Sequence, residues 1–409
     1  MSLLPGPEPR RRQRVPFAAA VTIMAAVFMG SAVPARVVAA QGPDIGVSIG
    51  ASILDSTSAS QRADDSRSAP SIAWRQIPGG PGTGCAEGAP FSYFVHSGDP
   101  RRVLVVLDGG GACWNPFTCV EHPTFTAAVD STVDPGRLYG VLDLDRADNP
   151  FHGFTVVRVP YCTGDVHLGR RDAVYQVTDS SGSVTQRVAI HHGGNANVED
   201  ALRWMYRSGS DPSVVVVVGL SAGAVATPFY AAELARHFGR ARIVSLGDGA
   251  GGYHAGNVSR TLSAWNTAGV LRADSWYRGM DSSHVTTETI TARAARGAPR
   301  VRYAQVNAAE DSVQVMFLKL LGVKQPRVDS LMAVSFREIR RSVPGLRTYT
   351  TPGPMHTVLT RPEFYTVRAG GVSLRDWVAA LVAGKPVQNV GDALLQRALQ
   401  PRGSPGSHD

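Results

Sequence analysis

The stretch V-V-V-V-V-G-L-S-A-G, residues 214–223, decides the fold of this chain. Five consecutive valines are typical of a strand buried on both faces of a parallel sheet. The next five residues match the pattern G-x-S-x-G around Ser221, and an alanine-rich segment, residues 222–238, follows as an expected helix. A strand, a sharp turn carrying serine and a helix together predict a nucleophile elbow rather than a chance tight turn. Gly219 and Gly223 suit this turn because the flanking backbones must pass closely, and the helix N-terminus places positive dipole where an oxyanion would form.

Short apolar runs recur on both sides of this motif and predict further strands. Residues 198–206 predict a helix before the valine strand. Strands that alternate with helices indicate the α/β class, with a mostly parallel sheet, helices on both faces and functional groups beyond the carboxyl ends of the strands. We therefore expect an α/β-hydrolase fold, with residues 253–300 as a candidate cap over the site. The expected strands are residues 91–95, 103–107, 154–159, 214–218, 243–246 and 301–306.

A serine nucleophile needs a base and an acid that orients the base, and in this fold they follow in the order serine, acid, histidine. Asp311 comes directly after the strand at 301–306, where the orienting carboxylate belongs. Its neighbour Glu310 and the strand-end residue Asp248 are the alternatives. His356 stands in the Pro/Gly loop T-P-G-P-M-H and is the expected base.

The oxyanion of the reaction needs two backbone N–H donors. Ala222 follows the nucleophile and is the first expected donor. The second should come from the loop D-G-G-G-A-C-W, residues 108–114, which follows an early strand and is rich in the glycines that let a backbone turn its amides toward substrate. A flexible turn without function is the alternative. Trp114 and Phe117 either line the pocket or simply pack.

The chain has four cysteines, an even number that indicates two disulfides in an exported protein. Cys113 and Cys119 enclose only five residues, so a local bridge between them is the simplest, which leaves Cys85 for Cys162. Three pairings are formally open, and the spacing fits no familiar zinc pattern. The pair His191-His192 also predicts no metal site, because adjacent histidines on a regular element do not readily bind one ion.

The two ends of the chain differ from its middle. Residues 1–40 combine an arginine-rich head, an apolar run and small residues, which predicts a signal peptide cleaved after Ala35 or Ala40. An uncleaved membrane anchor is the alternative. Residues 41–71 resemble a flexible leader and residues 388–409 a loose C-terminal tail, which leaves residues 72–387 as one catalytic domain. We expect a secreted protein, or one of the periplasm or cell envelope.

The net charge gives little reason to expect a charged partner. The chain carries +8, but residues 1–40 hold five arginines and one glutamate, so the remainder is near +4. The sequence has no clustered basic stripe, and we expect no nucleic-acid partner. Membrane contact would come only from an uncleaved N-terminal segment, and the sequence does not indicate an oligomeric state.

Several motifs in register resemble the pectin acetylesterase family, which includes the animal carboxylesterase Notum. The blocks occur in the family's order and cover roughly residues 84–358. They are G-C at 84–85, L-D-G-G-G-A-C-W at 107–114 with Cys119, V-P-Y-C-T-G-D-V at 159–166, G-L-S-A-G at 219–223 and N-A-A-E-D-S-V-Q at 307–314.

The resemblance implies an α/β-hydrolase that cleaves carboxylic esters without a cofactor or metal. Gly111 stands where Notum has Trp, and Thr357 stands where plant members have Cys; both differences affect the pocket wall. The roles that the resemblance implies are nucleophile Ser221, acid Asp311, base His356, oxyanion donors Gly110, Gly111 and Ala222, and disulfides Cys113–Cys119 and Cys85–Cys162.

The resulting hypothesis is an exported serine carboxylesterase that hydrolyses short acyl esters, acetyl above all, on an acylated carbohydrate or a small ester. A lipid or protein O-deacylase is the first alternative, and it would need a deep apolar acyl pocket. A non-catalytic carbohydrate-binding relative is the second.

Overall fold

The structure is a computed structural model that describes residues 74–129, 138–255 and 257–399. The expected signal peptide at 1–40 and leader at 41–71 lie outside these residues. Within the described ranges, no helix has the length and apolar character needed to cross a membrane.

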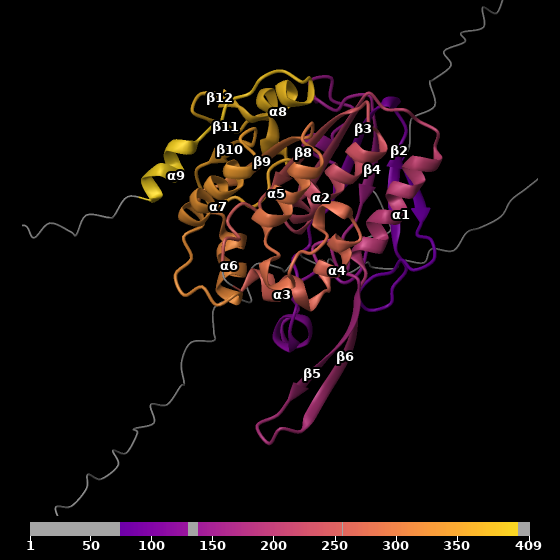
Figure 1. The fold of residues 1–409 in the computed structure, drawn as a ribbon, viewed down its shortest axis with the longest axis vertical. Coiled ribbons are helices and arrows are strands. Elements are labelled where there is room, and N and C mark those ends of the chain that lie inside the picture. Colours follow the sequence, from indigo (N-terminus) through magenta and orange to yellow (C-terminus); the bar gives the residue numbers. More distant parts are fainter. Residues whose placement is uncertain (1–73, 130–137, 256, 400–409) are drawn as a thin grey trace, which may run out of the picture. The chain divides into compact units, whose positions relative to one another are not determined.

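An eight-stranded, mostly parallel sheet forms the centre of the fold (Figure 1). Its order is β1-β2-β4-β3-β7-β8-β9-β10, and β2 runs antiparallel to both of its neighbours. All six expected strands are present, so the predicted α/β-hydrolase fold class is confirmed. The edge strands β1 and β10 were not expected. The bounds are β1 Arg75–Pro78, β2 Ser92–His96, β3 Asp99–Leu107, β4 Phe154–Val159, β7 Val214–Leu220, β8 Arg242–Asp248, β9 Arg302–Ala308 and β10 Arg347–Thr351.

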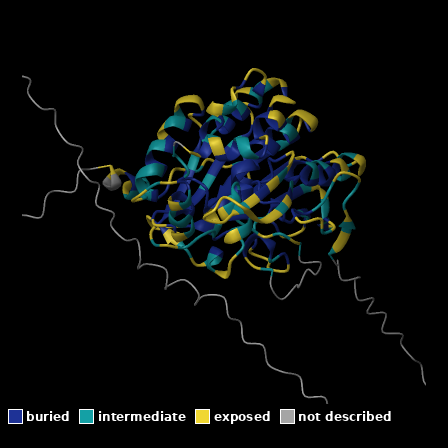
Figure 2. Cartoon of the chain, turned by 90° about the horizontal axis from the view of Figure 1, so that it is seen from below, coloured by how far each residue is buried: buried dark blue, intermediate teal, exposed yellow. Residues whose placement is uncertain are grey.

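Both faces of the sheet are covered, which explains the run of valines. Val215 and Val217 pack into the larger core, beneath α1, α2, α5 and α7. Val214, Val216 and Val218 face the opposite core, which α8 covers. A strand with both faces buried gains from an apolar residue at every position. Figure 2 shows the buried residues in the interior and the exposed ones on the outer helices and loops.

The helices follow the strands in an alternating order. The two expected helices correspond to α1 Gly194–Arg207 and α2 Ala222–His237. The others are α3 Val258–Ala264, α4 Thr267–Arg272, α5 Thr287–Gly297, α6 Ser312–Leu320, α7 Val328–Ser342, α8 Leu374–Val382 and α9 Asp392–Ala398.

A two-stranded ribbon that was not expected extends away from the sheet (Figure 1). It consists of β5 Arg171–Thr178 and β6 Val184–His192, paired antiparallel. A smaller ribbon joins β11 Arg368–Ala369 to β12 Val372–Ser373. The alternation of polar and apolar residues in β5 and β6 is short and interrupted, which is why no strand was predicted there.

Two expected boundaries change. The region 253–300 divides, since α3 lies over a cavity described below whereas α5 packs against α2 and α7 as part of the helical layer. The fold also continues past residue 387, where the catalytic domain was expected to end. Val390 is buried beside β10, its carbonyl accepts the Thr350 N–H at 2.9 Å, and α9 packs on α7. These contacts cannot be read from the local composition of a short, polar segment.

Candidate active site

The elbow predicted around Ser221 is present in the structure. Ser221 follows β7, precedes α2 and has φ 50° and ψ −111°, a backbone conformation that L-residues avoid. A Cβ at Gly219 would overlap the Thr227 hydroxyl and the Gly223 carbonyl, and one at Gly223 would overlap the Leu107 carbonyl. The two glycines are therefore required because β3, β7 and α2 meet closely at this turn.

Asp311 and His356 lie together at the carboxyl ends of β9 and β10. His356 Nδ1 is 2.8 Å from Asp311 Oδ2 and 3.0 Å from Oδ1. Asp311 is fully buried and caps α6, where it accepts the backbone N–H groups of Val313 and Gln314. The Gln314 side chain donates to the same carboxylate at 3.0 Å. Three donors besides the imidazole hold this carboxylate in the position that orients His356.

The two loops that carry this pair run side by side. Ala309 N donates to Thr351 O at 2.8 Å and Ser312 N to Pro354 O at 3.1 Å, so the loop before His356 follows the segment that carries Asp311. Glu310, one alternative acid, is exposed, and among the described residues the carboxylate paired with His356 is that of Asp311. The parallel pairing of β9 with β10 places the two loops at one edge of the sheet.

Asp248, the other alternative acid, joins the serine turn to the histidine loop. Its backbone carbonyl accepts the Ser221 N–H at 2.7 Å. Its buried Oδ2 accepts the N–H groups of Val358 and Leu359 at 2.7 and 2.8 Å. A Cβ on the next residue, Gly249, would be 3.1 Å from His356 Cε1, so the imidazole lies directly over this junction. Among the described residues, no hydrogen bond joins the Ser221 hydroxyl to His356.

The expected oxyanion loop lies against the elbow. A Cβ at Gly109 would be 2.8 Å from Leu220 O, and Gly111 has φ +77° and lines the same cavity as Ser221 and Ala222. Ala222 N is the first amide of α2 and has no acceptor within the helix. The Gly110 and Gly111 amides have no protein acceptor within the described chain. Gly110 itself packs against Tyr161 and Thr126 rather than lining the cavity.

A buried polar network that the sequence analysis missed supports this loop. His167 Nε2 is 2.9 Å from the Asp108 carbonyl, and because a carbonyl only accepts, Nε2 carries the proton. Burial lowers the pKa of His167, which favours this neutral form. The fully buried Asp165 accepts from Thr163, His167 N and Gly194 N. The D-V-H run at residues 165–167 is the sequence signal that could have indicated this network.

A small, apolar cavity opens beside Ser221. Its volume is about 70 Å³. Trp114 lines it, as one interpretation of the sequence expected, whereas Phe117 is exposed and its ring lies tilted against His122. The Trp265 indole, also in the wall, donates to Cys113 O at 2.7 Å and so ties α3 to the oxyanion loop. The apolar wall, which sequence reasoning did not assemble, also includes Val166, Val225, Tyr253, Val258, Leu262, Phe317 and Leu321.

Both disulfides pair as expected, Cys85 with Cys162 and Cys113 with Cys119. The second bridge stiffens the segment directly after the oxyanion glycines. The first joins the segment before β2 to the segment after β4.

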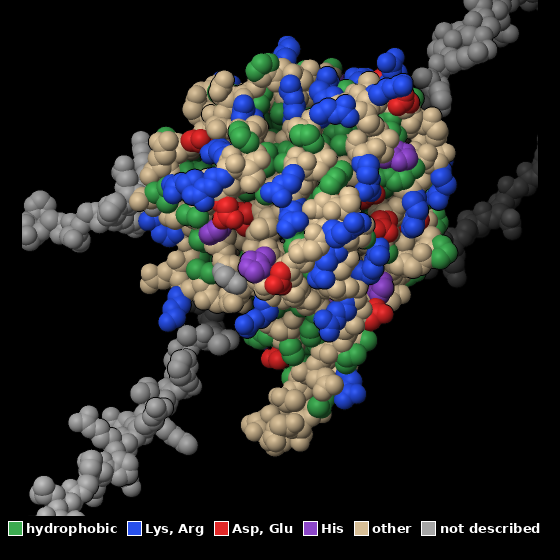
Figure 3. Space-filling model, viewed as in Figure 1, with side chains coloured by type: hydrophobic (Ala, Val, Ile, Leu, Met, Phe, Trp, Pro, Cys, Tyr) green, Lys and Arg blue, Asp and Glu red, His purple; other side chains and the backbone are tan. Residues whose placement is uncertain are grey.

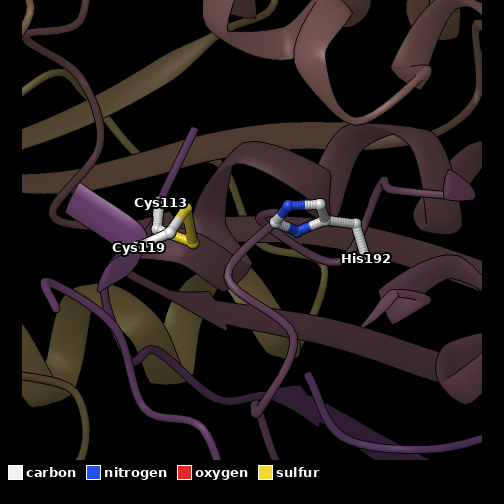
Figure 4. Close-up of side chains that lie close together, drawn as sticks. All are labelled: Cys113, Cys119 and His192. Atoms are coloured by element: carbon white, nitrogen blue, oxygen red, sulfur yellow. A yellow bond between two sulfur atoms is a disulfide. The ribbon is translucent and has the colours of Figure 1, made fainter. Parts of the chain in front are cut away.

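One cluster of potential metal ligands lies beside the second disulfide. Figure 4 shows the His192 ring facing the bridged sulfurs of Cys113 and Cys119. Both sulfurs are used in the disulfide. His192 Nδ1 is 2.9 Å from Thr163 O and Nε2 is 2.9 Å from the Tyr175 hydroxyl. This donor set does not fit a metal ion, because each atom already has a partner. His191 instead pairs with Asp172 across the ribbon.

A parallel sheet with a strained serine turn after a central strand and a histidine–carboxylate pair at the same edge defines an α/β-hydrolase. The pectinacetylesterase family model matches residues 76–289, slightly more than half of the chain. The chain therefore belongs to the pectinacetylesterase family.

A curated relative supports this assignment. It is the zebrafish (Danio rerio) protein described as "Inactive palmitoleoyl-protein carboxylesterase notum1b", 33% identical over 90 residues. The match covers 21% of this chain and 65% of the relative, so the chain spans less than two thirds of that protein's length.

Proposed function

We propose that this protein is an exported serine carboxylesterase that removes short acyl groups, acetyl above all, from a polysaccharide. The observation that carries the proposal is the buried Asp311–His356 pair, joined through Asp248 to the strained turn of Ser221. Membership of the pectinacetylesterase family supports acetyl ester chemistry. The two disulfides favour an oxidising compartment, which agrees with export.

The mechanism follows from the roles that these positions allow. Ser221 Oγ attacks the ester carbonyl while His356 takes its proton, and Asp311 holds the imidazole tautomer and stabilises the imidazolium. The amides of Ala222 and of the glycine loop stabilise the tetrahedral oxyanion, aided by the N-terminus of α2. His356 returns the proton to the leaving alcohol and then activates the water that releases the acyl group. The Ser221–His356 hydrogen bond forms with substrate bound, since catalytic hydrogen bonds are often long without it.

The cavity favours a second candidate, a lipid or protein O-deacylase. Its wall is almost wholly apolar, with Trp114, Trp265 and Phe317 among its residues. Such a wall suits a hydrocarbon chain better than a sugar, because burying apolar area gives roughly 25 cal/mol per Å². Its small volume of about 70 Å³ suits a short acyl chain, however, which supports the acetyl esterase as the first candidate. The acyl group would enter this cavity while the alcohol partner stays outside it.

A series of p-nitrophenyl esters tests both candidates. Purified protein is assayed on the acetate, butyrate and octanoate, with Ser221→Ala and the matched surface variant Ser181→Ala. We expect acetate hydrolysis that falls at least about 10³-fold in Ser221→Ala and is unchanged in Ser181→Ala. A rate that rises up to octanoate favours the deacylase.

The third alternative, a non-catalytic carbohydrate-binding relative, has a separate readout. The zebrafish relative is itself described as inactive, so similarity to such relatives does not by itself establish activity. A fluorophosphonate should label Ser221 in the wild-type protein. If the protein shows no hydrolysis and no labelling, the esterase proposal is rejected and a binding protein remains.

A further inference from the structure

A second, larger hollow lies at the amino ends of the parallel strands, whereas the candidate active site lies at their carboxyl ends. Its volume is about 540 Å³, within the range typical of ligand pockets. Arg302 and Arg347 line it at the starts of β9 and β10, whereas Asp311 and His356 follow the ends of these strands. The loops after α5, α7 and α8 complete its wall. The hollow is therefore separate from the esterase site.

The wall carries four cationic side chains, from Arg300, Arg302, Arg347 and Lys385. No aspartate or glutamate is among its lining residues, and none of the four cations forms an ion pair within the described chain. Lysine and arginine also predominate over acidic side chains on the face shown in Figure 3. Four like charges around one hollow repel each other, and an anion relieves this repulsion.

A buried donor in the same wall has no partner. Tyr303 is 3% exposed, and its hydroxyl lacks a hydrogen-bond partner among the described residues. Buried hydroxyls are nearly always hydrogen-bonded, and leaving one unsatisfied destabilises the folded state. Burial raises the pKa of this phenol, so it stays protonated and is available to donate.

Backbone carbonyls after α8 accept hydrogen bonds from two of these cations but neutralise only a small part of their charge. Arg302 donates to Lys385 O at 3.1 Å and Arg347 to Val387 O at 2.9 Å, contacts that satisfy carbonyls after α8. These acceptors are neutral, and a helix C-terminus carries only about half a negative charge. Arg347 also donates to Pro344 O and Leu346 O, and Arg300 donates to Gly239 O. Each guanidinium has five N–H donors, so at least two on each side chain have no partner among the described residues. The Lys385 ammonium makes no hydrogen bond within the described chain.

We propose that this hollow binds a ligand with two or more oxyanion groups. Four cations around one hollow suit several anionic groups rather than a single ion. Planar guanidinium groups bind carboxylate, sulfate and phosphate oxygens in pairs. The oxyanions could belong to a small polyanion or to an acidic oligosaccharide. The site does not depend on the esterase reaction.

Isothermal titration calorimetry at low salt tests the site on the full chain. The probes are inorganic pyrophosphate, trigalacturonate and its neutral methyl ester. The variants are Lys385→Gln, which removes no hydrogen bond of the fold, Tyr303→Phe, and the double variant Arg302→Gln/Arg347→Gln. Lys324→Gln and Tyr139→Phe are exposed controls of matched chemistry.

We expect pyrophosphate or trigalacturonate to bind and the neutral ester not to bind. Lys385→Gln should weaken binding about tenfold, Tyr303→Phe several-fold and the double variant beyond detection, whereas the controls bind as wild type does. Binding of pyrophosphate identifies a small polyanion, and binding of trigalacturonate alone identifies an acidic oligosaccharide.

Two results would overturn the proposal. One is the absence of binding by either anion at millimolar concentration, and the other is equal affinity in wild type, Lys385→Gln and Tyr303→Phe. If the arginine variant does not fold, Lys385→Gln and Tyr303→Phe decide. Hydrolysis of p-nitrophenyl acetate should be unchanged in all variants, so failure of the esterase proposal is scored separately.

Discussion

Asp248 shows how a residue can stand where a catalytic acid is expected in the sequence and yet make different contacts in the structure. It stands at a strand end, as the orienting acid does, yet His356 Nδ1 contacts Asp311. Asp248 instead holds the turn of Ser221 with its backbone and the His356 loop with its carboxylate. It is thus a positioning residue for both.

Two matched substitutions separate these roles. Asp311→Asn should lower kcat by about 10³- to 10⁴-fold, because the amide favours the wrong imidazole tautomer. Asp248→Asn should cost less than about tenfold, since an amide oxygen still accepts the Val358 and Leu359 N–H groups. Steady-state kinetics on p-nitrophenyl acetate measures both. A larger loss from Asp248→Asn than from Asp311→Asn would assign the acid to Asp248.

Asp248 also makes stability depend on pH. Burial raises the pKa of its carboxyl from 3.8 to about 6. Between these pH values Asp248 keeps a proton in the folded chain that it has lost in the unfolded chain. The contribution of this proton to the free energy of unfolding is therefore full below pH 4 and is lost as the pH rises to 6. The Tm of Asp248→Asn minus that of wild type should therefore increase from pH 4 to 6 and stay constant above. A flat difference would contradict the raised pKa.

At the scale of elements, the active site depends on how closely β3, β7 and α2 approach each other. Gly223 lies where a Cβ would overlap the Leu107 carbonyl, and Gly109 approaches the other side of the elbow. The oxyanion loop and the nucleophile turn are therefore held against each other by backbone contact. In the proposed mechanism this contact would set their geometry before substrate binds, as electrostatic stabilisation requires.

Gly223→Ala tests this contact. The added methyl must displace either β3 or α2, so we expect a loss of about 2 kcal/mol or more in the free energy of unfolding. Gly239→Ala is the control, because nothing lies within 4 Å of a Cβ there. Urea denaturation measures both variants. Equal midpoints for the two would mean that the elbow is not tightly packed.

At the scale of the whole molecule, the described fold places its two candidate sites at opposite ends of the parallel strands. The candidate esterase residues follow the carboxyl ends of the strands, and the cationic hollow lies at their amino ends. The two disulfides also differ, in the length of chain that each one closes. Cys113–Cys119 closes a local loop with a sequence separation of 6. Cys85–Cys162 has a sequence separation of 77 and joins the segments next to the paired strands β2 and β4.

Their removal should therefore have unequal effects. From loop entropy alone, the double alanine variant of Cys85 and Cys162 should lose about 4–5 kcal/mol of stability, against about 2 kcal/mol for Cys113 and Cys119. The second variant should show the larger relative loss of kcat, because it loosens the oxyanion loop. Chemical denaturation and esterase kinetics check the two effects. The opposite ranking of stabilities would show that strain, not chain entropy, dominates.

The sequence alone determined the features that depend on local pattern. Neighbouring residues are enough to predict the elbow at 214–223, six strands and a local disulfide between Cys113 and Cys119. Periodicity and turn chemistry act within one element, so they can be read from a short stretch. Strand β10 was missed because it is short and every residue in R-T-Y-T-T except Tyr349 is polar, although the strand leads into the loop of His356.

Only the tertiary structure decided which carboxylate contacts His356, because Asp248, Glu310 and Asp311 all stand near strand ends in the sequence. The pairing of β9 with β10 brings Asp311 to a histidine 45 residues away and leaves Glu310 in solvent. The apolar cavity and the cationic hollow likewise take residues from several distant segments. Contacts of this kind depend on how whole elements pack, and no local pattern in the chain encodes them.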